Sequence, residues 1–302
     1  MHAHASSQRA LAIVLALNLL TLVVEVLAGW WTNSLALWSD AGHMLGDVGA
    51  LALSFAAVQL AARPPSPEKT WGWHRSEILA ALANGVTLIV VAALVGMEAV
   101  RRFAAPPAVP GSIVAWVGAI GLSVNVISAL VLARGAGQDL NRRAAYLHSL
   151  SDALGSIGAL TAGVLMARFG WWVADPLASV LIALLVFIAG VRLLRDTVHV
   201  LMEGVPAAVD LAEIGGTLAA VQGVSVVHDL HVWSIGSNRH ALSAHLEIER
   251  LEEWPAILQS AQAVLRERFG VDHVTLQPEL VPALRLPRQA TVTLWPRGQR
   301  PS

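Results

Sequence analysis

The chain has 302 residues, of which 55% are apolar and only 14% are charged, and its net charge is −1. Soluble proteins carry about a quarter charged residues, so this composition argues against an ordinary cytosolic enzyme. A nearly neutral chain has no basic field to collect nucleic acid, so no nucleic-acid partner is expected. The absence of cysteine excludes disulfides, thiolate catalysis and zinc fingers.

Six apolar stretches of about 20 residues fill the first two thirds of the chain, and each is long enough to cross a bilayer as a helix. They cover roughly residues 10–29, 35–60, 78–100, 111–133, 145–167 and 173–194. We therefore expect a short N-terminal segment (1–9) followed by an all-α six-helix bundle in the membrane (10–203).

The distribution of Lys and Arg between the spans predicts the orientation. Nine of these residues fall on the side of the two termini, and three (Arg101, Arg102 and Arg168) fall on the other side. The positive-inside rule then places both termini in the cytoplasm, and in a bacterium the membrane would be the inner one. Trp30, Trp31 and other tryptophans lie at the outer interface in this arrangement, as an aromatic belt does.

Charge rises and apolar runs shorten after residue 204, which indicates a separate domain (204–285). The predicted order is a helix from Asp210, strands over 224–235 and 241–248, a helix over 254–269 and a strand over 271–277. This α-β-β-α-β order suits a compact α+β domain of the ferredoxin-like, or metallochaperone-like, kind. The remaining residues, 286–302, show no period and are expected to form a disordered tail.

Two of the apolar stretches contain a His followed four residues later by an Asp. These pairs are His43 with Asp47 and His148 with Asp152. Residues at i and i+4 leave the same face of a helix, so two packed helices would aim two imidazoles and two carboxylates at one point. Four such N and O ligands suit tetrahedral Zn²⁺. Each pair could instead be an intrahelical hydrogen bond near a helix end.

Asp40 and Glu25 are among the other acidic residues in the spans, where charge is costly. Asp40 precedes His43 by three residues and is expected beside the ligands, as a second-shell or entrance group. Glu25 is expected near the outer end of its span, in a structural role.

Five segments together resemble the cation diffusion facilitator family, of the bacterial zinc-transporter type. They read SDAGHMLGD over 39–47, GWHRSEILA over 72–80, HSLSD over 148–152, DPL over 175–177 and HDLHVW over 228–233. The resemblance extends over about residues 10–280. It implies a homodimer that exports Zn²⁺ or Cd²⁺ in exchange for protons, with His43, Asp47, His148 and Asp152 as the transport site.

The resemblance also implies metal sites outside the membrane. His228 and His245 match cytoplasmic ligand positions of the family, and Glu279 stands near a position where relatives use a further ligand. His231 belongs to the same motif as His228, and alternation along a strand predicts that the two face opposite sides. His74 stands one place away from a ligand position in the loop between spans two and three. Zinc would thus be both cargo and a regulatory ligand.

Two other functions remain open from the residues alone. A membrane metalloenzyme would need an open metal position and a general base, and the chain has neither His-Glu-x-x-His nor Gly-x-Ser-x-Gly. A passive divalent-cation channel would conduct without regard to a pH gradient. An ATP-driven pump is excluded more firmly, because the chain lacks a phosphate-binding loop.

Overall fold

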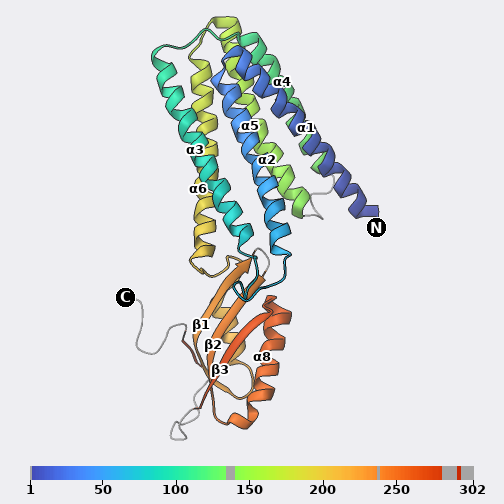
Figure 1. Ribbon diagram of the computed structural model, residues 1–302, viewed down its shortest axis with the longest axis vertical. Coiled ribbons are helices and arrows are strands. Elements are labelled where there is room, and N and C mark those ends of the chain that lie inside the picture. The colour runs from blue at the N-terminus through green and yellow to red at the C-terminus, as the bar shows by residue number, and fades with distance from the viewer. Residues whose placement is uncertain (1, 134–139, 237–238, 281–290, 294–302) are drawn as a thin grey trace. The chain divides into compact units, whose positions relative to one another are not determined.

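A computed structural model describes residues 2–133, 140–236, 239–280 and 291–293 (Figure 1). For some of these, His148 among them, only the backbone is described. The chain divides into two compact units. One contains residues 1–53 and 83–194, and the other contains residues 54–82 and 195–302.

Within the described residues, six helices are long and apolar enough to cross a membrane, which confirms the predicted spans. They are α1 (His2–Thr32), α2 (Leu35–Ala61), α3 (Ser76–Ala104), α4 (Gly111–Ala133), α5 (Leu140–Phe169) and α6 (Ala174–Leu201). Leu20, Leu94 and Leu130 are more than half exposed, as expected of side chains that face lipid rather than a protein core.

Glycines allow α4 and α5 to pack backbone to backbone. A Cβ on Gly118 would lie 2.6 Å from the backbone nitrogen of Leu160, and one on Gly111 would lie 2.6 Å from Cβ of Met166. Small residues at such contacts are the usual means by which membrane helices approach closely, since lipid provides no hydrophobic drive between helices. This contact fixes α5, and therefore Asp152, within the bundle.

The first turn of α2 is capped by a side chain from α6. Asp175 is buried, and its Oδ1 accepts a hydrogen bond from Oγ of Ser34 (2.5 Å). Its Oδ2 accepts from the backbone N–H of Leu35 (2.7 Å), and its Oδ1 also lies 3.3 Å from the backbone nitrogen of Ala36. A carboxylate at a helix N-terminus satisfies unpaired N–H groups and favours the helix dipole. The helix that carries His43 and Asp47 thus starts at a fixed point on α6.

The second unit contains the predicted α+β domain. Its elements are α7 (Leu211–Ala219), β1 (Val224–Gly236), β2 (Arg239–Ile248), the 3-10 turn η1 (Leu251–Glu253), α8 (Trp254–Phe269), β3 (His273–Leu280) and β4 (Thr291–Thr293). The sheet order is β3-β2-β1-β4, with β1 antiparallel to β2 and the two outer strands parallel to their neighbours. The predicted order α-β-β-α-β is therefore present from α7 to β3.

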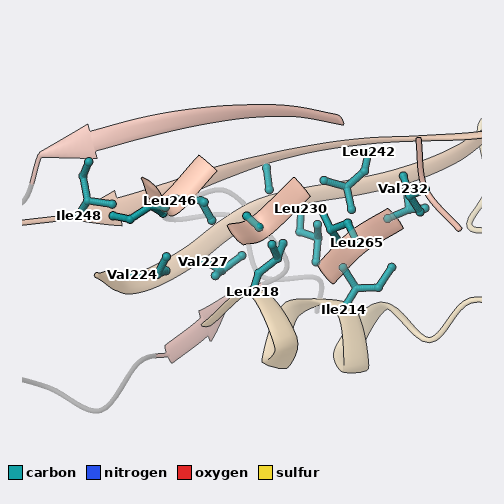
Figure 2. Close-up of a cluster of buried hydrophobic side chains, with 14 residues drawn as sticks. Ile214, Leu218, Val224, Val227, Leu230, Val232, Leu242, Leu246, Ile248 and Leu265 are labelled. Carbon is teal, nitrogen blue, oxygen red and sulfur yellow. The ribbon is translucent and has the colours of Figure 1, made fainter. Parts of the chain in front are cut away.

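One face of this sheet forms the core of the domain (Figure 2). Leu230 and Leu246 from the strands pack with Leu218 of α7 and Leu265 of α8, and all four are almost fully buried.

Local sequence signals determine where the two helices of this domain begin and end. The Asp210 carboxylate accepts hydrogen bonds from the backbone N–H groups of Ala212 and Glu213, and Gly270 ends α8 in a left-handed conformation.

The structure differs from the sequence prediction at Thr291–Thr293, within the segment expected to be a disordered tail. These residues form β4, which pairs in parallel with Val226–His228 of β1. A Thr-Val-Thr run is β-branched throughout and suits an edge strand, but three residues are too short to show alternation in the sequence. The other residues of 286–302 lie outside the described part of the chain.

Candidate metal sites

The ligand atoms of His43, Asp47 and Asp152 meet between α2 and α5, all within 4.8 Å of one another. Nε2 of His43 lies 3.3 Å from Oδ1 of Asp152 and 3.8 Å from Oδ2 of Asp47. Ligand atoms around a tetrahedral zinc with bonds of about 2 Å lie about 3.3 Å apart. Three predicted ligands thus stand near the spacing that one metal ion requires.

The fourth predicted ligand, His148, has a side chain that lies outside the described part of the structure. Its backbone belongs to α5, one helical turn before Asp152. Residues four apart share a face of a helix, so the backbone is compatible with a fourth ligand here. The assignment of His148 stays a prediction.

The three placed side chains differ in their access to solvent. The side chains of His43 and Asp47 are 20% and 27% exposed, whereas that of Asp152 is 8% exposed. A group of one imidazole and two carboxylates provides borderline and hard donors, which suits a divalent ion such as Zn²⁺. The group lies among apolar helices, where unpaired charge is expensive and a cation offsets the cost.

Asp40 and Glu25 are both buried beside this group, at 4% and 1% exposure. Asp40 was expected there. Glu25 was expected near the outer end of its span in a structural role, and the structure directs it inward from α1, with its carboxyl group within hydrogen-bonding reach of Asp40. An acidic residue in an apolar span was the available signal in the sequence, but only packing shows which way the residue points.

A second cluster lies on the face of the sheet opposite the core. His228 and His245 are paired across β1 and β2. Oε2 of Glu279, on β3, lies 3.0 Å from Nε2 of His228, and its Oε1 lies 2.9 Å from Nδ1 of His245. The ligand atoms of these three residues lie within 4.8 Å of one another. The structure therefore brings together three residues that the family resemblance implied.

His231 joins the same face because β1 contains a bulge, so the prediction of opposite faces was wrong. The register shifts between His228 and His231, so that His231 pairs with Ser243, two residues from His245. The extra residue is Asp229, whose φ of 52° lies in the left-handed region. The Asp229 carboxylate contacts His231 Nε2 at 3.0 Å and His245 Nε2 at 3.7 Å.

His74 lies between α2 and α3. Nη1 of Arg239 lies 2.7 Å from His74 Nε2, which places a cation at the nitrogen that a metal would need. Among the described residues, His74 belongs to neither of the two groups with metal-ligand spacing. Its assignment as a ligand stays a prediction without structural support.

Comparison with known families matches both parts of the chain. The family described as "Cation efflux transmembrane domain" covers residues 11–202, and the family described as "Cation efflux protein, cytoplasmic domain" covers residues 206–281.

Curated relatives are similar over nearly their whole length. The chain is 41% identical to the "Cadmium, cobalt and zinc/H(+)-K(+) antiporter" of Bacillus velezensis, over 92% of this chain and 91% of that protein. It is 39% identical to the "Metal cation efflux system protein CzcD" of Cupriavidus metallidurans (93% and 90%). It is 38% identical to the "Zinc transporter ZitB" of Escherichia coli (86% and 84%).

A solved structure, the "Metal-bound C-terminal domain of the CzcD transporter", is 34% identical and covers 24% of this chain and all of that one, with a TM-score of 0.23. The family matches and the relatives agree with the six spans and the α+β domain. The chain belongs to the cation diffusion facilitator family of cation-efflux membrane transporters, and it is a transporter rather than an enzyme.

Proposed function

We propose that this transporter exports Zn²⁺, and also Cd²⁺, from the cytoplasm in exchange for protons. The observation that carries the proposal is the group formed by His43, Asp47 and Asp152 between α2 and α5. The names of the similar proteins, which mention zinc, cadmium, cobalt and protons, support the same substrate class and the same coupling.

Proton exchange follows from the chemistry of these ligands. A metal binds neutral imidazole and ionised carboxylate, so metal binding displaces protons from the site. On the outer side, protons compete for the same atoms, above all for imidazole with its ordinary pKa of about 6.5. The metal leaves, and the protonated ligands return inward. His148 completes the tetrahedron in this proposal.

The positions of Lys and Arg between the spans support an orientation with both termini in the cytoplasm. The α+β domain would then sense cytoplasmic metal. We assign regulatory zinc to His228, His245 and Glu279, because their ligand atoms stand within 4.8 Å of one another. The shared face of His231 and Asp229 provides further donors beside them. The family that matches residues 206–281 has the short name ZT_dimer, and this reference to a dimer supports assembly as a homodimer.

The test is zinc uptake into proteoliposomes under an imposed pH gradient. The native chain is compared with His43→Ala, and with His240→Ala as a matched change outside the transport group. We expect gradient-driven uptake by the native chain and the control, and its loss in His43→Ala. Uptake that ignores the gradient would favour a channel and refute proton exchange. Equal uptake by both variants would refute the site assignment.

A further inference from the structure

The proposed cycle uses only the metal ligands, yet two further acidic side chains are buried beside them. Glu25 on α1 and Asp40 on α2 are 1% and 4% exposed. Their carboxyl groups lie within hydrogen-bonding reach of each other. Asp40 is three residues before His43, a rise of about 4.5 Å along the helix toward the α1–α2 turn. The pair therefore stands next to the metal site without belonging to it.

Two glycines leave room for these carboxyl groups. A Cβ on Gly121 of α4 would lie 3.1 Å from Oε1 of Glu25, and one on Gly155 of α5 would lie 3.1 Å from Oδ1 of Asp40. Ser156 lies against the same space, since its Oγ would also be 3.1 Å from the Cβ on Gly121. Gly121 of α4 and Gly155 and Ser156 of α5 therefore lie against the two carboxyl groups.

The environment of the second carboxyl oxygen of Glu25 indicates that the Glu25–Asp40 pair holds a proton. Oε2 of Glu25 is buried and has no hydrogen-bond partner within the described part of the chain. The nearby polar contact, from Nδ2 of Asn125 to Oγ of Ser156 (3.2 Å), does not include it. An ionised carboxylate is rarely buried in this way, because the lost hydration is not replaced.

The groups that face Glu25 do not neutralise two negative charges. Asp40 faces it from α2, and Asp152 lies beyond from α5. His43 and Asp47 lie near Asp40. α4 contains no titratable residue, and neither α2 nor the apolar part of α1 contains Lys or Arg. Two adjacent carboxylates in such surroundings cannot both be ionised, because like charges at this distance repel strongly where water is absent.

We propose that Glu25 and Asp40 share one exchangeable proton, and that this pair is a proton-binding site of the transport cycle distinct from the metal ligands. The proposal rests on the proposed exchange of metal for protons. A divalent ion at His43, Asp47 and Asp152 brings positive charge close to the pair, which favours the ionised form and releases the proton to water. By thermodynamic reciprocity, a proton on the pair weakens metal binding.

The test counts the protons released when zinc binds to the purified full-length chain. Glu25→Gln keeps the shape of the side chain and a hydrogen bond to Asp40, but the amide cannot ionise. Zinc is added in weak buffer, and released protons are measured with a pH indicator. We expect Glu25→Gln to release about one proton fewer per zinc than the native chain, with the same number of zinc ions bound. Glu98→Gln is the matched control, because its side chain is 42% exposed, and it should match the native chain.

An unchanged proton count in Glu25→Gln would overturn the proposal. Asp40→Asn is the second variant and should show the same deficit. Size-exclusion elution and tryptophan fluorescence report whether each variant is folded, and unfolding of both would assign the pair a structural role and overturn the proposal as well. This measurement is separate from the flux test. A native chain that shows no gradient-driven zinc uptake would refute proton exchange. An unchanged proton count in Glu25→Gln would refute only the proton-binding role of Glu25 and Asp40.

Discussion

Replacement of Asp175 by Ala should destabilise the membrane domain through the start of α2. The buried carboxylate accepts from Oγ of Ser34 and from the backbone nitrogens of Leu35 and Ala36. A lost helix cap costs about 1 kcal/mol, and a buried donor left without an acceptor costs about 1–3 kcal/mol. The Ser34 hydroxyl still accepts from the Leu37 N–H (3.3 Å), so part of the cap survives.

We therefore expect a total loss of about 3 kcal/mol for Asp175→Ala. Asp175→Asn keeps one acceptor oxygen but loses the charge, so about 1 kcal/mol is expected. The assay is thermal unfolding in detergent, followed by tryptophan fluorescence. Asp196→Ala, an exposed position on the same helix, is the matched control. The capping argument would be refuted if Asp175→Ala were as stable as the native chain. It would also be refuted if Asp175→Asn and Asp175→Ala lowered the thermal stability by the same amount.

Three further predictions concern the site and its support. Asp152→Ala should abolish zinc transport, because the proposed metal ligand is lost. The variant should elute from a sizing column as the native chain does, because Ala is smaller than Asp and adds no steric clash. Normal zinc flux in proteoliposomes would contradict this prediction. Zinc affinity measured by calorimetry should fall as the pH is lowered, since protons compete with the metal for imidazole, and His43→Ala should flatten this dependence. Gly118→Ala should destabilise the bundle by about 1–3 kcal/mol, because the new Cβ would meet the Leu160 backbone at 2.6 Å; thermal unfolding equal to that of the native chain would argue against close packing of α4 and α5.

The fold was predictable because its main signals are local. Each membrane span is a long, mostly apolar stretch, and turn residues such as Gly270 mark the ends of elements in the α+β domain. The common face of His43 and Asp47 was also predictable, since their i, i+4 spacing fixes it before any packing is known.

The remaining features depend on contacts that spacing does not encode. Ser34 and Asp175 are 141 residues apart in the chain, and nothing local joins them. The inward direction of Glu25 depends on the space left by Gly121 on another helix. The bulge at Asp229 inserts one residue into β1, and a one-residue shift reverses which face His231 occupies.

The Asp175 cap has a mechanical consequence for the transport cycle. Because both oxygens of one α6 side chain hold the first turn of α2, the starts of the two helices are displaced together. A movement that changes access to His43 must therefore move α2 and α6 together as a rigid body. Otherwise it must bend α2 between its first turn and His43. Gly42 lies just before His43, and Gly46 lies between His43 and Asp47. Glycine weakens a helix interior, so a bend in α2 costs least beside His43 and Asp47.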